Sequence, residues 1–214
     1  MDHTDIERIA GELMDKHGCH TAILYGSWAR GDSTSESDVD LMWVRAEGEP
    51  LRDAHIEAGV YIDGFVYPES SLVTLETPLL RVLGGQVIRE RDGYGTALLA
   101  RLQELSDAGP KPLPPDERRA VLLWSRKMLE RLRDRNGLDA SYRRMQLLQT
   151  ALEDYFAFRG AWFCGPKASF AWLLANDANA YRCFERATEP GAAHSALEDL
   201  VAAVYRPFEH EVQV

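Results

Sequence analysis

The chain has 214 residues, enough for one large domain or two small ones with a buried core. Hydrophobic residues make up 45% and charged residues 27%, which is ordinary for a globular protein and excludes fibrous, collagenous and disordered classes. The formal net charge is -10, from 34 acidic and 24 basic side chains, so the surface repels a phosphate backbone. This charge disfavours extended nucleic acid as a partner and suits a small or cationic one.

The N-terminal residues Met1 to Glu7 are acidic and lack the apolar segment of a signal peptide. No apolar run approaches the roughly 20 residues that a membrane-spanning helix needs. The three cysteines match neither the spacing of a zinc site nor that of a disulfide framework. We therefore expect a cytoplasmic protein with no membrane partner.

The first half of the chain mixes helical and extended patterns. A helix is predicted over 4–17, where Thr4 and Glu7 have the spacing of a capping box. Short apolar runs predict strands over 21–25, 38–44 and 59–67, and a short strand followed by a helix is expected between 86 and 105. These elements indicate an α+β domain over 1–108.

A proline-rich stretch over 109–116 separates this half from a helical one. Its four prolines exclude a regular helix and favour an extended, semi-rigid linker. Beyond it, apolar residues recur at helical intervals and predict helices over 117–135, 140–158, 166–176, 178–187 and 194–205. The second domain, over 117–214, is therefore expected to be all-helical.

Gly26 and Ser27 lie where a predicted strand ends and a helix begins. A helix N-terminus presents unpaired amides and a favourable dipole, which bind phosphate oxygens. Gly26 permits a close backbone approach, and the Ser27 hydroxyl adds a hydrogen-bond donor. A glycine–serine pair is also an ordinary helix start, so these two residues alone do not separate phosphate binding from capping.

Asp38 and Asp40 point to metal chemistry. Residues two apart on a strand face the same side and lie roughly 6.6 Å apart along it. Two such carboxylates can bind a pair of divalent ions about 3.5–4 Å apart, the geometry of two-metal phosphoryl transfer. Asp40 leads directly into the apolar run Leu41 to Val44, where an unpaired charge would be costly, and a metal ion removes that conflict. Hard oxygen ligands and a phosphate substrate indicate Mg²⁺.

Asp63 supplies a third carboxylate. It interrupts the apolar run Val60 to Val66, and its neighbours on the same face are Tyr61 and Phe65, so it is expected to be the lone charge there. One interpretation is a third metal ligand, which could also accept the proton of an attacking hydroxyl. The alternative is a carboxylate on an exposed strand face.

Gly26-Ser27, ten intervening residues, Asp38-Val39-Asp40 and Asp63 on a later strand together resemble the signature of the DNA polymerase β-like nucleotidyltransferase superfamily. The resemblance covers about residues 20–67. In size and in its appended helical domain, the chain is similar to the minimal nucleotidyltransferases, which include aminoglycoside and lincosamide enzymes. The resemblance implies a mixed sheet with helices that holds a nucleoside triphosphate, with ATP as the expected co-substrate, and two Mg²⁺ ions.

The resemblance also implies roles for individual residues. Gly26 and Ser27 would bind the β- and γ-phosphates. Asp38 and Asp40 would ligate both metal ions, and Asp63 the catalytic one. Arg30 is a candidate for neutralising phosphate charge, with a solvent-exposed arginine as the alternative. Relatives also include enzymes whose active site is shared across a homodimer, so a homodimer is compatible with the sequence.

The helical half contains a second group of candidates. Lys167 follows Pro166 in the first turn of a predicted helix, where a cation opposes the helix dipole. Related transferases place a lysine of the helical domain on the triphosphate, so Lys167 is a candidate nucleotide-binding residue. Glu153, Asp154 and Arg159 are candidates for binding the acceptor. For Glu153 and Asp154, the alternative is a solvated helix face.

The leading hypothesis is transfer of AMP from ATP to a hydroxyl of an antibiotic-like small molecule, with release of pyrophosphate and a role in antibiotic resistance. A protein- or tRNA-modifying nucleotidyltransferase of toxin–antitoxin type is the first alternative, and the acidic charge argues against tRNA. A non-catalytic nucleotide-binding regulator is the second. The full set of three carboxylates argues against that class, because a binder does not need them.

Overall fold

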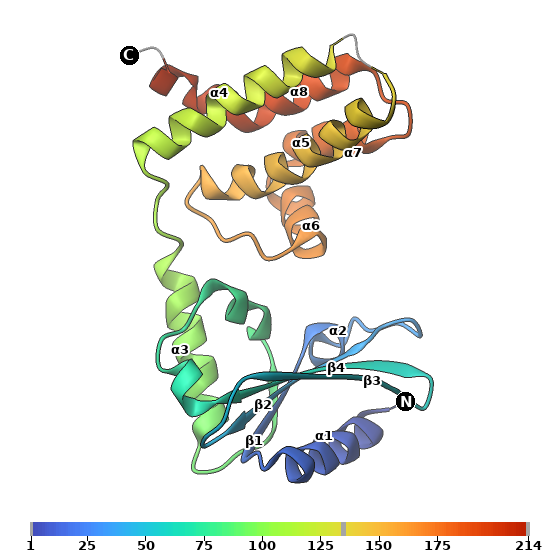
Figure 1. The fold of residues 1–214 in the computed structure, drawn as a ribbon, viewed down its shortest axis with the longest axis vertical. Coiled ribbons are helices and arrows are strands. Elements are labelled where there is room, and N and C mark those ends of the chain that lie inside the picture. The colour runs from blue at the N-terminus through green and yellow to red at the C-terminus, as the bar shows by residue number, and fades with distance from the viewer. Residues whose placement is uncertain (1, 134–135, 213–214) are drawn as a thin grey trace. The chain divides into compact units, whose positions relative to one another are not determined.

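A computed structural model describes residues 2–133 and 136–212 of the chain. The chain divides into two compact units, Met1–Ala108 and Gly109–Val214. The first contains a mixed sheet with helices and the second is helical, so the predicted fold class is confirmed (Figure 1).

Among the described residues of the first unit, five strands form one sheet in the order β3-β4-β2-β1-β5. β2 and β4 run parallel, whereas the other neighbouring strands are antiparallel. The elements of this unit are α1 (His3–His17), β1 (Thr21–Tyr25), α2 (Gly26–Arg30), β2 (Val39–Arg45), β3 (Leu51–Glu57), β4 (Val60–Pro68), η1 (Glu69–Leu72), η2 (Thr77–Val82), β5 (Gln86–Arg89) and α3 (Tyr94–Ala108).

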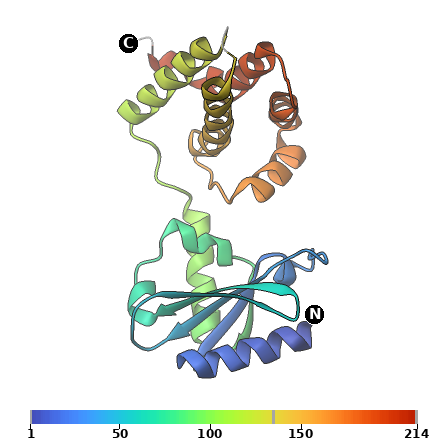
Figure 2. The ribbon, with the colours of Figure 1, turned by 45° about the vertical axis from the view of Figure 1, so that its right-hand side comes forward.

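Helices cover both faces of this sheet (Figure 1, Figure 2). α1 packs on one face, where Ile9 joins the cluster around Trp43 and the Trp43 indole donates a hydrogen bond of 3.1 Å to the carbonyl of Ala10. α3, η1 and η2 pack on the other face, where Leu98 shares a cluster with Met42. Both faces of β2 are therefore buried, which explains its nearly continuous apolar sequence.

Two local features differ from the predictions. The helix N-cap is Asp2, whose carboxylate accepts from the Asp5 amide in a reciprocal capping box, so the expected Thr4 and Glu7 box is wrong. The strand β3 is absent from the sequence prediction, because its charged residues conceal the strand pattern. β3 is an edge strand, and charges on an edge strand prevent it from pairing with another chain.

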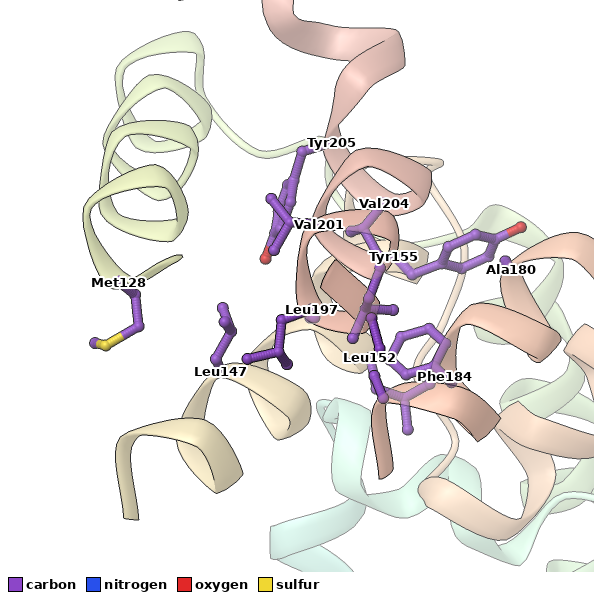
Figure 3. Packing of buried hydrophobic residues seen from close by; sticks show 14 of the residues in the cluster. Met128, Leu147, Leu152, Tyr155, Ala180, Phe184, Leu197, Val201, Val204 and Tyr205 are labelled. Carbon is purple, nitrogen blue, oxygen red and sulfur yellow. The ribbon is translucent and has the colours of Figure 1, made fainter. Parts of the chain in front are cut away.

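The second unit contains α4 (Pro115–Leu132), α5 (Leu138–Ala157), α6 (Pro166–Asn176), α7 (Ala178–Thr188), α8 (His194–Tyr205) and η3 (Arg206–Val212). Its core consists of apolar side chains from several of these helices, among them Met128 of α4, Leu147 of α5, Phe184 of α7 and Leu200 of α8. Figure 3 shows side chains of α5, α7 and α8 meeting in this core.

The helices match the sequence pattern closely. α6 and α8 have the predicted bounds, and α7 extends one residue beyond its predicted end. Pro115 begins α4, inside the stretch predicted as linker, because proline is well suited to the first position of a helix, whose amide has no partner. Within the described part of the chain, every helix is too short or too polar to cross a bilayer.

Candidate functional site

The turn from β1 into α2 brings the backbone against a carboxylate. Gly26 has φ of +72°, a left-handed conformation that side-chain-bearing residues rarely adopt. A Cβ atom at this position would overlap Oδ2 of Asp40 and lie 3.0 Å from its Cγ. Glycine is therefore needed for two reasons, the backbone angle and the space that the Asp40 carboxylate occupies.

Asp40 stands at the centre of a group of three carboxylates. It is paired in register with Asp63 on the parallel neighbour β4 and with Tyr25 on β1. Asp38 is exposed and lies just ahead of β2, which begins at Val39 and not at Asp38 as predicted. Burial, then the negative charges of Asp38 and Asp63, raise the pKa of Asp40 from its ordinary 3.8 to about 6. The site thus concentrates negative charge around a partly buried carboxylate, where a positive counter-charge is favourable.

Arg52 of β3 supplies part of that counter-charge. Its Nε and Nη2 donate to the two carboxylate oxygens of Asp63, at 2.7 and 2.9 Å. The Asp63 side chain is 17% exposed and that of Arg52 is 53% exposed, so the pair lies at the surface end of the site. Asp63 is the lone charge on its face of β4, as predicted, and its partner Arg52 comes from the neighbouring strand β3.

A second arginine, Arg81 of η2, lies over the same face of the sheet. Its guanidinium carbon is 4.1 Å from the centre of the Phe65 ring, and its Nη2 donates to the Tyr67 hydroxyl at 3.1 Å. The charge of Arg81 also lowers the pKa of Asp40, in part offsetting the effects that raise it. Sequence reasoning missed both arginines. Neither had a sequence signal, because apolar and charged residues do not alternate along β3 and Arg81 lies in the short 3-10 segment η2.

Whether a divalent cation fits can be judged from these contacts. Carboxylate oxygens are the ligands that Mg²⁺ prefers, and the raised pKa of Asp40 marks a position where added positive charge is favourable. Within residues 2–133 and 136–212, no three His, Cys, Asp or Glu side chains already stand in the arrangement of a metal site. Asp63 is turned toward Arg52, so a three-carboxylate site would require that ion pair to open.

Ser27 and Arg30 belong to the same corner. Ser27 is 8% exposed, and α2 begins at Gly26 as the sequence predicts, although it has only five residues and so a small dipole. Arg30 is exposed and pairs with Asp32 at 3.3 Å, and its charge slightly lowers the pKa of Asp40. The structure therefore brings Gly26, Ser27, Arg30 and the three carboxylates together within the first unit.

The remaining candidates lie in the helical unit. Lys167 is exposed in the first turn of α6, and Glu153 is exposed on α5, where it accepts from Gln149 at 3.2 Å. Asp154 is buried and accepts a hydrogen bond from the Tyr205 hydroxyl. Burial raises the pKa of Asp154 to about 6.

Arg159 has a structural function within the helical unit. Its guanidinium donates to the carbonyls of Ala203 and Val204 near the end of α8, both at 3.2 Å, and to the carbonyl of Tyr155 at 3.1 Å. The last carbonyls of a helix have no partner in the helix, so these bonds cap α8. The solvated helix face considered for Asp154 is wrong, because its carboxylate is buried and bonded to Tyr205.

No family model matches the sequence, and no curated protein matches it. Among solved structures, the chain is similar to a nucleotidyltransferase-like protein from Exiguobacterium sibiricum, with 16% sequence identity and a TM-score of 0.44. The alignment covers 97% of this chain and 74% of that one. Similarity at this level establishes neither a family nor an activity, so the function has to be inferred from the geometry of the site itself.

Proposed function

We propose that this chain is a Mg²⁺-dependent nucleotidyltransferase that moves a nucleoside monophosphate from a nucleoside triphosphate to an acceptor. The observation that carries the proposal is the group of carboxylates around Asp40. Asp63 faces it from the parallel strand, Asp38 precedes it by two residues, and the Gly26 backbone touches it. Repulsion and desolvation of these carboxylates destabilise the folded protein unless cations bind there.

The residues would act as follows. Asp38 and Asp40 would hold the metal ions, and Asp63 would be a further ligand if its ion pair with Arg52 opened. When bound, Mg²⁺ would neutralise the phosphate charge and stabilise the attacking and leaving oxygens. The free amides at the start of α2 and the Ser27 hydroxyl would donate to phosphate oxygens.

The reaction exchanges one bond at phosphorus for another. The acceptor oxygen forms a bond to the α-phosphorus of the triphosphate, and the bond from that phosphorus to the bridging oxygen breaks. Pyrophosphate leaves with the bond's electron pair. Asp63, whose carboxylate lies beside Asp40 at the edge of the site, would take the proton of the acceptor hydroxyl.

The proposed co-substrate is ATP, and the proposed acceptor is a hydroxyl on a small molecule of the antibiotic type. A net charge of -10 favours a cationic small molecule over a nucleic acid. Lys167 is proposed as a further phosphate contact. An enzyme that modifies a protein, or a non-catalytic regulator, would use the same carboxylate group. The assay below distinguishes both from the proposed function.

The test is pyrophosphate release by the purified chain with Mg²⁺, each of the four common ribonucleoside triphosphates, and a panel of aminoglycosides and lincosamides. Asp40→Asn keeps the shape of the side chain and removes its charge, so it should abolish release. Asp107→Asn is the matched control, since Asp107 is exposed on α3 and contacts Gln103 only at the surface. This control should retain full activity.

Three results are informative. Release that needs one acceptor and is lost in Asp40→Asn supports the proposal and names the acceptor class. Mg²⁺-dependent nucleotide binding without release from any acceptor, together with no labelling of protein in a lysate, favours a regulator. Absence of Mg²⁺-dependent nucleotide binding contradicts the proposal as a whole.

A further inference from the structure

A pocket of about 380 Å³ opens in the helical unit, and all of its lining residues belong to that unit. It is formed by α5, the segment that leads into α6, α6 itself and α7. Six apolar residues supply most of its wall: Leu148, Leu152, Phe163, Pro166, Phe170 and Phe184.

The floor of this pocket is part of the packed core. Leu152 is 5% exposed and Phe184 is 1% exposed, and Figure 3 shows both within the core of the unit. Phe170 meets Phe184 edge to face, with ring centres 5.7 Å apart. Because the walls are fixed by core packing, the pocket does not need to be opened by a ligand, which is typical of small-molecule sites.

The polar groups at the pocket select the charge of an occupant. Among the described residues that line it, Glu153 is the only ionisable one, and Lys167 is not among them. Gln149 donates to Glu153 Oε1 at 3.2 Å and so orients the carboxylate. The Thr188 hydroxyl donates to carbonyls of its own helix, at 2.9 Å, and offers the pocket only acceptor lone pairs. Aromatic ring faces also attract cations.

We propose that this pocket binds a small molecule made of an apolar body and a protonated amine. The apolar body lies among the phenylalanine and leucine side chains, and the amine lies at Glu153. A volume of about 380 Å³ falls in the range of roughly 300–1,000 Å³ found for small-molecule sites. This site is separate from the proposed nucleotide transfer and does not depend on it.

The test compares three probes of one shape, 4-phenylbutylamine, 4-phenylbutanol and 4-phenylbutyrate, titrated calorimetrically into the full chain. The amine should bind about 3- to 30-fold more tightly than the alcohol, as expected for an exposed ion pair combined with a cation–aromatic contact. The carboxylate should bind most weakly, because Glu153 repels it. An alcohol that binds as tightly as the amine, or no binding by the amine, overturns the proposal.

Two variants locate the site. Glu153→Gln should lower the preference for amine over alcohol about two- to fivefold, whereas Glu130→Gln, a change at an exposed carboxylate on α4, should leave it unchanged. Leu148→Trp should fill the pocket and weaken all three probes at least about tenfold, with circular dichroism confirming the fold. An unchanged preference in Glu153→Gln overturns the proposal whether or not Leu148→Trp folds.

Discussion

Replacing Gly26 by alanine tests how tightly the β1–α2 turn is held against Asp40. At φ of +72° an alanine costs roughly 1–2 kcal/mol in backbone strain alone. Its Cβ would also overlap Asp40 Oδ2 and lie 3.0 Å from Cγ, so either the turn or the carboxylate must move. Overpacking of this kind adds about 1–3 kcal/mol, which gives a total loss of roughly 2–5 kcal/mol in the free energy of unfolding.

Gly31 provides the matched control for this change. It ends the same short helix at φ of +76°, and an added Cβ there meets nothing within 4 Å. Gly31→Ala should therefore cost only the backbone strain, roughly 1–2 kcal/mol. The difference between the two variants isolates the contact with Asp40.

The assay is urea denaturation of both variants, with pyrophosphate release measured on the folded protein. Since a displacement of about 1 Å of a catalytic group can cost roughly 100-fold in rate, Gly26→Ala should lose at least that much while Gly31→Ala remains active. Equal stability and equal activity in the two variants would refute the reasoning, because the carboxylate would then not be held against the turn.

Three further predictions concern single side chains. Burial raises the pKa of Asp154 from 3.8 to about 6, so the stability that this carboxyl contributes is fully present below about pH 4 and is lost as the pH rises through 6. In urea denaturation, Asp154→Asn should therefore be more stable than the wild type at about pH 8 but not at about pH 4. Arg159→Leu should lose roughly 1–3 kcal/mol of stability through the uncapped carbonyls, whereas Arg186→Leu at an exposed ion pair should lose less than about 1 kcal/mol. Arg52→Gln should lower by a few fold the Mg²⁺ concentration needed for pyrophosphate release, because Asp63 no longer has to leave an ion pair. If this variant needs more Mg²⁺ than the wild type, Arg52 instead positions Asp63 for its function.

Most regular elements could be predicted from local pattern. The helix periodicity of α6 and α8 is sufficient for their bounds, and the apolar run of β2 identifies a strand buried on both faces. β3 escaped prediction because its apolar and charged residues do not alternate. Asp53 lies on its half-buried face, where it pairs with Lys16, whereas Ile56 is exposed.

The sequence by itself determined the local part of the site. The spacing of Asp38 and Asp40 and the position of Gly26 at the end of a strand depend on a few consecutive residues, so the pattern is visible in one dimension. The predicted roles of these residues in metal and phosphate binding remain predictions that the assays above test.

Only the tertiary structure decided which residues surround Asp40. Asp63 reaches it through the parallel pairing of β2 with β4, which the intervening strand β3 makes possible. The antiparallel pairing of β3 with β4 places Arg52 on Asp63, and the path of η2 places Arg81 over Phe65. Strand register and the course of an irregular segment depend on contacts between residues distant in sequence, so no local pattern specifies them.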